Sequence, residues 1–295
     1  MTQLIYTLKT VFLIAITLLS YSTWAEDKHM AGSSIRFAVL GDAEPKPVAE
    51  FPNLARAIDD VNRLASEKKI DFILGVGDIP HKGTMLQYNN VTPELQRLTL
   101  PFYPIMGNEE HGAEDAVTRF LHFANLWNKG KVTIKSDKYT LEFDDFAIVL
   151  ASPDHGRDFN STGVNWILKQ LKQLSPKPVL LVVHGAQQGV YPENPDKGIS
   201  HEKFANVIAQ PNLKAVISGD LHMDMDRVDH SKKIGKVHYL HIPALERTKI
   251  PDETRHNPMY RVFNISPEGD VDVATYSVGN QHAIAEHSYQ FSLNQ

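Results

Sequence analysis

The chain has 295 residues, of which 42% are hydrophobic and 22% are charged, and this composition supports a globular fold with a sizeable core. Its formal net charge is −5, so it lacks the basic footprint of a nucleic-acid-binding protein. It contains no Cys, which excludes disulfides, thiolate zinc sites and cysteine nucleophiles. Neither a Gly-x-Ser-x-Gly elbow nor a Gly-rich phosphate loop follows an apolar run. The remaining site chemistry is a metal bound by oxygen and nitrogen ligands.

The N-terminal 25 residues resemble a secretory signal peptide. Lys9 precedes an apolar stretch at 11–19, and Thr23-Trp24-Ala25 forms a small-residue cleavage motif. The stretch is shorter than the ~20 apolar residues of a spanning helix. We therefore expect cleavage after Ala25 and an exported protein, periplasmic or secreted, without membrane attachment. An uncleaved anchor is the alternative. Residues 26–295 are predicted to form a single domain with its core at about 35–278.

Short apolar runs alternate with helical patterns along most of the chain. The runs are rich in Val, Ile, Leu and Phe and mostly unalternating, which is typical of strands buried on both faces; they occupy 35–40, 70–76, 101–106, 178–183 and 213–217. Apolar residues recur at helical spacing over 51–64, 117–124, 164–174 and 204–208. Ser161 or Thr162 is the expected cap of the third helix. This alternation predicts parallel βαβ units.

The C-terminal part of the chain has a different pattern. Apolar segments at 236–242, 260–265 and 271–276 follow one another without helices, and a turn at 267–270 separates the last two. We expect an antiparallel meander here, with His238 on a sheet surface. Residues after Gly279 are polar, and we expect them to be loosely held.

A polar motif follows each of the five apolar runs. In chain order the motifs are Gly41-Asp42-Ala43-Glu44, Gly77-Asp78, Gly107-Asn108-Glu109-Glu110, His184-Gly185 and Gly219-Asp220-Leu221-His222. In α/β sheets the functional crevice lies beyond the carboxyl ends of the strands. The five motifs are therefore expected to meet at one site.

This ordered set resembles the calcineurin-like metallophosphoesterases, whose blocks are Asp-x-His, Gly-Asp, Gly-Asn-His-Asp/Glu, a lone His and Gly-His-x-His. The spaced match covers about residues 35–245. It implies an α/β fold in which a two-sheet β-sandwich is flanked by helices in four layers. It also implies hydrolysis of a small phosphomonoester or phosphodiester at a dinuclear metal centre.

The resemblance assigns a metal-binding role to seven residues. Asp78 would bridge two divalent ions, because its two oxygens can each serve one ion. The remaining ligands would be Asp42, Glu44 and His222 for the first ion, and Asn108, His184 and Asp220 for the second. Mn is the favoured metal, with Mg, Fe, Zn or Ca possible.

Three positions depart from the family pattern, because Glu44, Glu109 and Asp220 stand where the family has His. Four ligand carboxylates then face the two ions instead of two. A phosphate gains less from such a centre, and a bound water is acidified less. The oxygen-rich ligand set also favours Mn, Mg or Ca over Zn.

Catalysis and substrate binding depend on residues near the same motifs. Glu109 replaces the catalytic His of the family, and His111 is a candidate substitute proton donor. Lys82 and Arg157, with Asn108, are candidates for holding a phosphate oxygen. The alternative for His111, Lys82 and Arg157 is a solvated loop position.

Two functions fit this reading. The first is an exported metal-dependent phosphoesterase. The second is a weakened or inactive metal-binding member of the fold that acts as a binding or sensory protein. A metal-free interaction module ranks last, because four carboxylates facing one another are costly without a cation.

Overall fold

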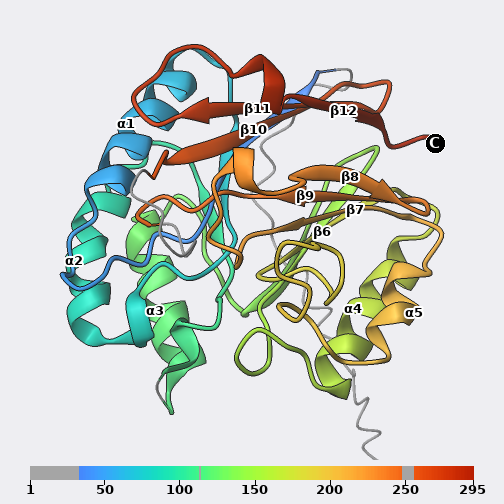
Figure 1. Ribbon diagram of the computed structural model, residues 1–295, viewed down its shortest axis with the longest axis horizontal. Coiled ribbons are helices and arrows are strands. Elements are labelled where there is room, and N and C mark those ends of the chain that lie inside the picture. The colour runs from blue at the N-terminus through green and yellow to red at the C-terminus, as the bar shows by residue number, and fades with distance from the viewer. Residues whose placement is uncertain (1–32, 113, 248–255) are drawn as a thin grey trace, which may run out of the picture. The chain divides into compact units, whose positions relative to one another are not determined.

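A computed structural model describes residues 33–112, 114–247 and 256–295, and the expected signal peptide at 1–25 lies outside them. Gly32–Gln295 is one compact unit. Its strands form two six-stranded sheets that pack face to face, and helices cover the outer face of each sheet (Figure 1). Within the described part of the chain, no helix has the length and apolar character needed to cross a membrane.

The first sheet combines three parallel strands with three antiparallel ones, in the order β12-β11-β10-β1-β2-β3. β1 pairs parallel with β2 and β2 with β3, while β10 joins the other edge of β1 in antiparallel register. The strands are β1 (Ile35–Leu40), β2 (Phe72–Gly75), β3 (Phe102–Pro104), β10 (Met259–Ile265), β11 (Asp270–Ser277) and β12 (Tyr289–Ser292).

The second sheet has the order β4-β5-β6-β7-β9-β8. Its four central strands are parallel, and the two edge strands are antiparallel to their neighbours. The strands are β4 (Lys138–Glu142), β5 (Ala147–Ala151), β6 (Val179–Val183), β7 (Leu213–Ser218), β8 (Ser231–Ile234) and β9 (Val237–His241).

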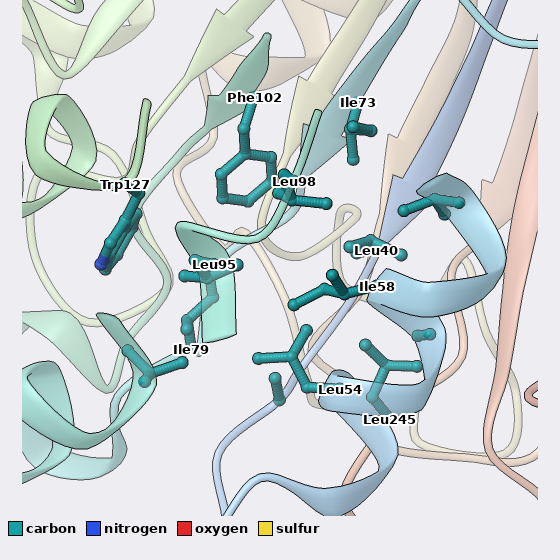
Figure 2. Packing of buried hydrophobic residues seen from close by; sticks show 14 of the residues in the cluster. Leu40, Leu54, Ile58, Ile73, Ile79, Leu95, Leu98, Phe102, Trp127 and Leu245 are labelled. Atoms are coloured by element: carbon teal, nitrogen blue, oxygen red, sulfur yellow. The ribbon is translucent and has the colours of Figure 1, made fainter. Parts of the chain in front are cut away.

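Helices on the outer faces complete four layers. α1 (Pro52–Ser66), α2 (Met85–Leu95) and α3 (Ala116–Asn128) pack against the first sheet, and Figure 2 shows part of that interface. There, Leu54 and Ile58 of α1 lie opposite the strand residues Leu40 and Ile73. α4 (Ser161–Leu174) and α5 (Phe204–Ile208) cover the second sheet. The predicted two-sheet sandwich flanked by helices is confirmed.

The core between the sheets is built from alternate residues of buried strands. Phe37 has no solvent exposure and stacks between Phe72 and Phe263, with ring centroids 5.1 and 5.0 Å away. Leu150, Val182 and other residues of the second sheet face this layer. Burying this much apolar surface fixes the two sheets together and so fixes the strand ends of both.

The structure contradicts three expectations for the C-terminal part of the chain. β9 lies in the second sheet, parallel to β7, whereas β10 and β11 lie in the first. The segment after Gly279 is not loosely held as a whole, because β12 pairs with β11 and buries Phe291. His238 is buried against Tyr289 and Phe291 instead of lying on a sheet surface.

Other local elements also differ from the expectation. Asn160, one residue before the predicted caps, accepts from the backbone N–H groups of Thr162 and Gly163 at the start of α4. Helix α2 was not predicted from the sequence, because the helix contains Pro93 and its mixed polarity obscures the helical pattern. β4 and β8 were also not predicted, because as edge strands they are only partly buried.

Candidate metal centre

The structure brings together side chains from five strand ends. β1, β2 and β3 of the first sheet and β6 and β7 of the second each lead directly into one of the polar motifs. Six of the seven predicted metal ligands are buried, and the seventh, Asn108, is partly buried. The predicted ligands form two groups, each centred on one histidine ring nitrogen.

The first group surrounds His222 at the end of β7. Its Nε2 lies 3.3 Å from Asp42 Oδ1, 3.5 Å from Glu44 Oε1 and 3.5 Å from Asp78 Oδ2. Ligand atoms about 2.1 Å from a common metal ion lie roughly 3.0–3.4 Å apart. The spacing of this group fits one divalent ion.

The second group surrounds His184 at the end of β6. Its Nε2 lies 3.3 Å from Asn108 Oδ1 and 3.4 Å from both Asp78 Oδ1 and Asp220 Oδ1. Its Nδ1 lies 2.9 Å from the carbonyl oxygen of Val76, which accepts the Nδ1 proton. That hydrogen bond leaves Nε2 directed at the carboxylates, as in histidines that bind metals.

Asp78 contributes one oxygen to each group, and the backbone around it is held firmly. Glu110 is buried, and its two oxygens accept from the N–H groups of Asp78, Ile79 and Gly107 at 2.7–3.0 Å. Burial and the charge of Asp78 raise the pKa of Glu110 to about 8. A Cβ atom at Gly107 would lie 2.3 Å from Asp78 Oδ1, so only glycine permits this approach of the two loops.

Four of the candidate ligands have a left-handed backbone conformation. Asp42, Asp78, Asp220 and His222 have φ values of 31°, 53°, 68° and 53°. Such conformations cost about 1–3 kcal/mol each for residues other than glycine, and they cluster at functional sites. Their occurrence here indicates that local backbone strain is tolerated because it orients these side chains toward the centre.

The centre stabilises positive charge at His184. Burial lowers the pKa of His184, but Asp78 and Asp220 outweigh that effect and hold the pKa well above its ordinary value. Burial alone would raise the pKa of Asp78, yet His184 and His222 hold it well below its usual range. Carboxylates that favour a cation at a buried nitrogen also favour a metal ion there.

Basic side chains, most of them not anticipated from the sequence, contact the carboxylates that replace family histidines. Lys46 Nζ lies 3.2 Å from Glu44 Oε2, and Arg247 contacts Glu44 Oε1. Lys197 Nζ lies 3.0 Å from Asp220 Oδ1. Arg157, one of the predicted substrate-binding residues, donates to Asp220 Oδ2 and to Asn108 Oδ1 at 3.0 Å each.

Glu109 lies at the open side of the centre beside His81. Its Oε2 is 2.7 Å from His81 Nδ1 and accepts from the backbone N–H of Lys82 at 2.8 Å. His81 Nδ1 is also 2.9 Å from Glu44 Oε2. Glu44, His81 and Glu109 therefore form a further set of metal-compatible atoms. Two other such sets, Asp42–Asp78–His184 and Glu44–Asp78–His222, are buried and drawn from the ligands of the two groups described above.

His111 and Lys82 are less directly involved in the centre. His111 Nε2 lies 3.0 Å from the carbonyl oxygen of Pro153, and burial lowers its pKa. Only the backbone of Lys82 contacts Glu109, and its ammonium group forms no ion pair with any residue that the structure describes. The geometry thus places Arg157, not Lys82, against the centre.

Comparison with known proteins shows related sequences and a shared fold. A 3′,5′-cyclic-nucleotide phosphodiesterase of Nostoc sp. is 26% identical over 180 residues, which are 60% of this chain and 63% of that protein. A probable glycerophosphodiester phosphodiesterase of Arcobacter nitrofigilis is 26% identical over 179 residues, 57% of this chain and 62% of that protein. The matched segment thus spans less than two thirds of either relative.

Two solved structures share the fold over 88% of this chain. A purple acid phosphatase from yellow lupin superposes with a TM-score of 0.62 at 13% identity and is covered over 54% of its length. GAP50, the anchor in the inner membrane complex of Plasmodium, superposes with a TM-score of 0.59 at 12% identity and is covered over 88%. The calcineurin-like phosphoesterase family matches residues 35–224, which include all seven candidate ligands. The chain therefore belongs to the calcineurin-like phosphoesterase family.

Proposed function

We propose that this protein is an exported phosphoesterase that hydrolyses a small phosphoester at a centre of two divalent metal ions. The observation that carries the proposal is that the two carboxylate oxygens of Asp78 face different groups. Its Oδ2 faces the His222 group, and its Oδ1 faces the His184 group. A carboxylate placed between two sets of ligand atoms is the arrangement that a dinuclear centre requires.

The residues present fit the metals of this family. The first ion would be held by Asp42, Glu44, Asp78 and His222, and the second by Asn108, His184, Asp220 and Asp78. Oxygen atoms dominate both sets, which favours Mn, with Mg, Fe, Zn or Ca as alternatives. Bound divalent ions would polarise the phosphoryl group and lower the pKa of a water molecule.

The side chains around this centre have separable roles. Arg157, which is 38% exposed, is placed to donate to a phosphate oxygen while it fixes Asn108 and Asp220. Asn108 is held in the same way and can orient the phosphate. Glu109 and His81 occupy the side where the leaving group would depart. His111 stays a second candidate for proton donation, although it contacts none of the candidate ligands among the described residues.

A phosphodiester is the favoured substrate class. The two curated relatives are phosphodiesterases, one named for cyclic nucleotides and the other, a probable assignment, for glycerophosphodiesters. A diester carries one negative charge per phosphate where a monoester carries up to two. An oxygen-rich centre with four ligand carboxylates repels the singly charged group less.

A second function is supported by Glu109. The family's catalytic His is replaced here by a carboxylate that His81 and Lys46 already engage. Such a centre can bind metal and anion without turnover, which is the property of a binding or sensory protein.

Metal content and turnover together decide between these functions. The purified protein is analysed for bound metal and assayed with bis-p-nitrophenyl phosphate and p-nitrophenyl phosphate in Mn, Mg, Zn and Ca. We expect two ions per chain and faster cleavage of the diester. Asp42→Ala serves as the matched inactive variant. Two bound ions without hydrolysis of either ester in any metal would favour the binding protein.

A further inference from the structure

Each carboxylate that replaces a family histidine has a basic partner from a different loop. Glu44 contacts Lys46 and Arg247, and Asp220 contacts Arg157 and Lys197. Glu109 is paired with His81 at 2.7 Å and has Lys46 Nζ at 3.9 Å. The acidic replacements and the basic residues thus occur together, one pair in each half of the centre.

The charge of the centre explains why such pairing is needed. Glu44 has no solvent exposure and the Asp220 side chain is only 1% exposed, so neither charge is screened by water. With Asp42, Asp78 and Glu109, these residues give five carboxylates, against which the two ions supply four positive charges. A centre left negative would repel the phosphate it must bind.

We propose that Lys46, Arg157, Lys197 and Arg247 are counter-ions built into the centre. They offset the added carboxylates, so that the metal-loaded centre stays attractive to an anionic phosphoester. This inference rests on the proposed function. It assigns these four side chains a role in setting the charge of the centre, where ordinary family members use neutral histidines.

Within each half, the two basic side chains differ in their exposure. Lys46 and Arg157 are 35% and 38% exposed and so lie where a substrate phosphate arrives. Lys197 and Arg247 are 12% and 23% exposed and lie deeper, against the ligand carboxylates. The deeper pair is therefore expected to act mainly on metal affinity, and the outer pair on phosphate affinity as well.

Removing a counter-ion is expected to have opposite effects on the binding of Mn and on the binding of phosphate. A carboxylate without its basic partner is a stronger metal ligand, so Mn binding tightens. The same change makes the loaded centre more negative, so phosphate binding weakens. Each effect is on the order of fivefold to tenfold for a partly buried charge. A residue that merely supports the local structure would weaken both.

The test uses the variants Lys197→Gln and Arg157→Gln, with Lys169→Gln on the exposed face of α4 as the matched control. Calorimetry gives the Kd for Mn binding to the metal-free protein and then the Kd for inorganic phosphate binding to the Mn-loaded protein. We expect a tighter Mn Kd in both variants, a weaker phosphate Kd that is most marked in Arg157→Gln, and no change in the control. Weaker binding of both Mn and phosphate in the same variant would overturn the counter-ion role.

A rescue experiment separates this inference from the proposed function. Asp220→His alone leaves Arg157 and Lys197 without their carboxylate and should weaken Mn binding. Adding Arg157→Gln and Lys197→Gln to Asp220→His should restore most of that affinity. Absence of rescue contradicts the counter-ion role while wild-type Mn binding keeps the proposed function intact. Failure of the wild-type protein to bind any of Mn, Mg, Fe, Zn or Ca would instead overturn the proposed function itself.

Discussion

At the scale of single residues, Glu109 is the position at which the proposed turnover can be tested most directly. The sequence resemblance places it where the family has its catalytic His, and its Oε2 lies 2.7 Å from His81 Nδ1. Its backbone N–H donates to Asp78 Oδ1 at 2.8 Å, so the residue is tied to the proposed bridging ligand whatever its side chain. A substitution at 109 can therefore change the proton chemistry without displacing Asp78.

Glu109→His should raise turnover of a phosphodiester. An imidazole can donate a proton to the leaving oxygen near neutral pH, and general acid catalysis contributes roughly 10²–10⁴-fold. The measurement is kcat for a series of aryl and alkyl phosphodiesters with Mn. The gain should be larger for alkyl esters, whose leaving groups need a proton more.

Glu109→Gln is the control, because it removes the same charge without adding a proton donor. Equal gains in the His and Gln variants would mean that charge, not proton donation, limits turnover. A wild type that is already fast, with no gain in the His variant, would show that Glu109 or a neighbour has been recruited as the acid.

Asp78→Ala should remove more metal than any other single ligand substitution. Its two oxygens face different ligand groups, so its loss weakens both. Elemental analysis after gel filtration should find almost no Mn in Asp78→Ala and about one ion per chain in Asp42→Ala. If Asp78→Ala keeps both ions while Asp42→Ala loses them, the bridging role is wrong.

At the scale of elements, the carboxyl ends of five strands could be predicted because they carry a physical signature. A short unalternating apolar run followed by a polar motif that contains Gly indicates a buried strand that ends in a functional loop. β9 carries Val237, Tyr239 and Leu240 alongside two histidines, and nothing in its sequence indicates which sheet it joins. The sheet that a strand joins depends on the packing of the whole chain. The predicted meander was wrong because it placed β9 in the same sheet as β10 and β11.

The basic partners of the centre lie beyond the reach of a sequence pattern. Arg247 is 203 residues from Glu44, and Arg157 is 63 residues from Asp220. Several Lys and Arg residues occupy loops of equal polarity, and only the folded backbone selects the ones that face the carboxylates. The cost of clustered carboxylates did predict that some cation must be present. That electrostatic cost does not indicate whether the cation is a metal ion or a basic side chain.

The loop after β9 also caps α1, and this contact depends on pH. Glu246 Oε1 accepts from the N–H of Leu54 at 2.8 Å, whereas Phe51 at the N-cap position offers no side-chain acceptor. Burial raises the pKa of Glu246 from 4.5 to about 7, although the Leu54 N–H acts in the opposite direction. Between these two values the folded state binds more protons than the unfolded state, so stability falls as the pH rises.

Glu246→Gln should remove this part of the pH dependence, because the amide stays neutral across the window. Urea unfolding at several pH values between 4.5 and 7 tests this, and the variant should gain stability relative to wild type as the pH rises. Glu202→Gln, at an exposed position before α5, is the control and should leave the slope unchanged. A slope that persists in Glu246→Gln would assign the pH dependence to another group.

At the scale of the whole molecule, the N-terminal 25 residues are predicted to direct export of the protein. We predict removal of this segment after Ala25 on export, since Lys9, the apolar stretch at 11–19 and Ala25 form a signal-peptide pattern. N-terminal sequencing of the protein recovered from the periplasm or medium of a bacterial host should begin at Glu26. An Ala25→Arg variant should block cleavage. Intact Met1 in an exported wild-type protein would contradict the prediction.

Metal binding should also stabilise the whole fold, because the ligands come from the strand ends of both sheets. A ligand that binds only the folded state stabilises it by about 2.7 kcal/mol at a free concentration of 100 Kd. Phe37→Ala provides a reference for damage away from the centre, since Phe37 is fully buried between Phe72 and Phe263 and its truncation costs about 3–5 kcal/mol. Thermal unfolding with Mn and with EDTA measures both effects. Phe37→Ala should lower the Tm in both conditions yet keep the Mn-dependent increase, whereas Asp78→Ala should lose that increase. An equal Mn-dependent increase in Asp78→Ala and wild type would place the stabilising metal away from the strand ends.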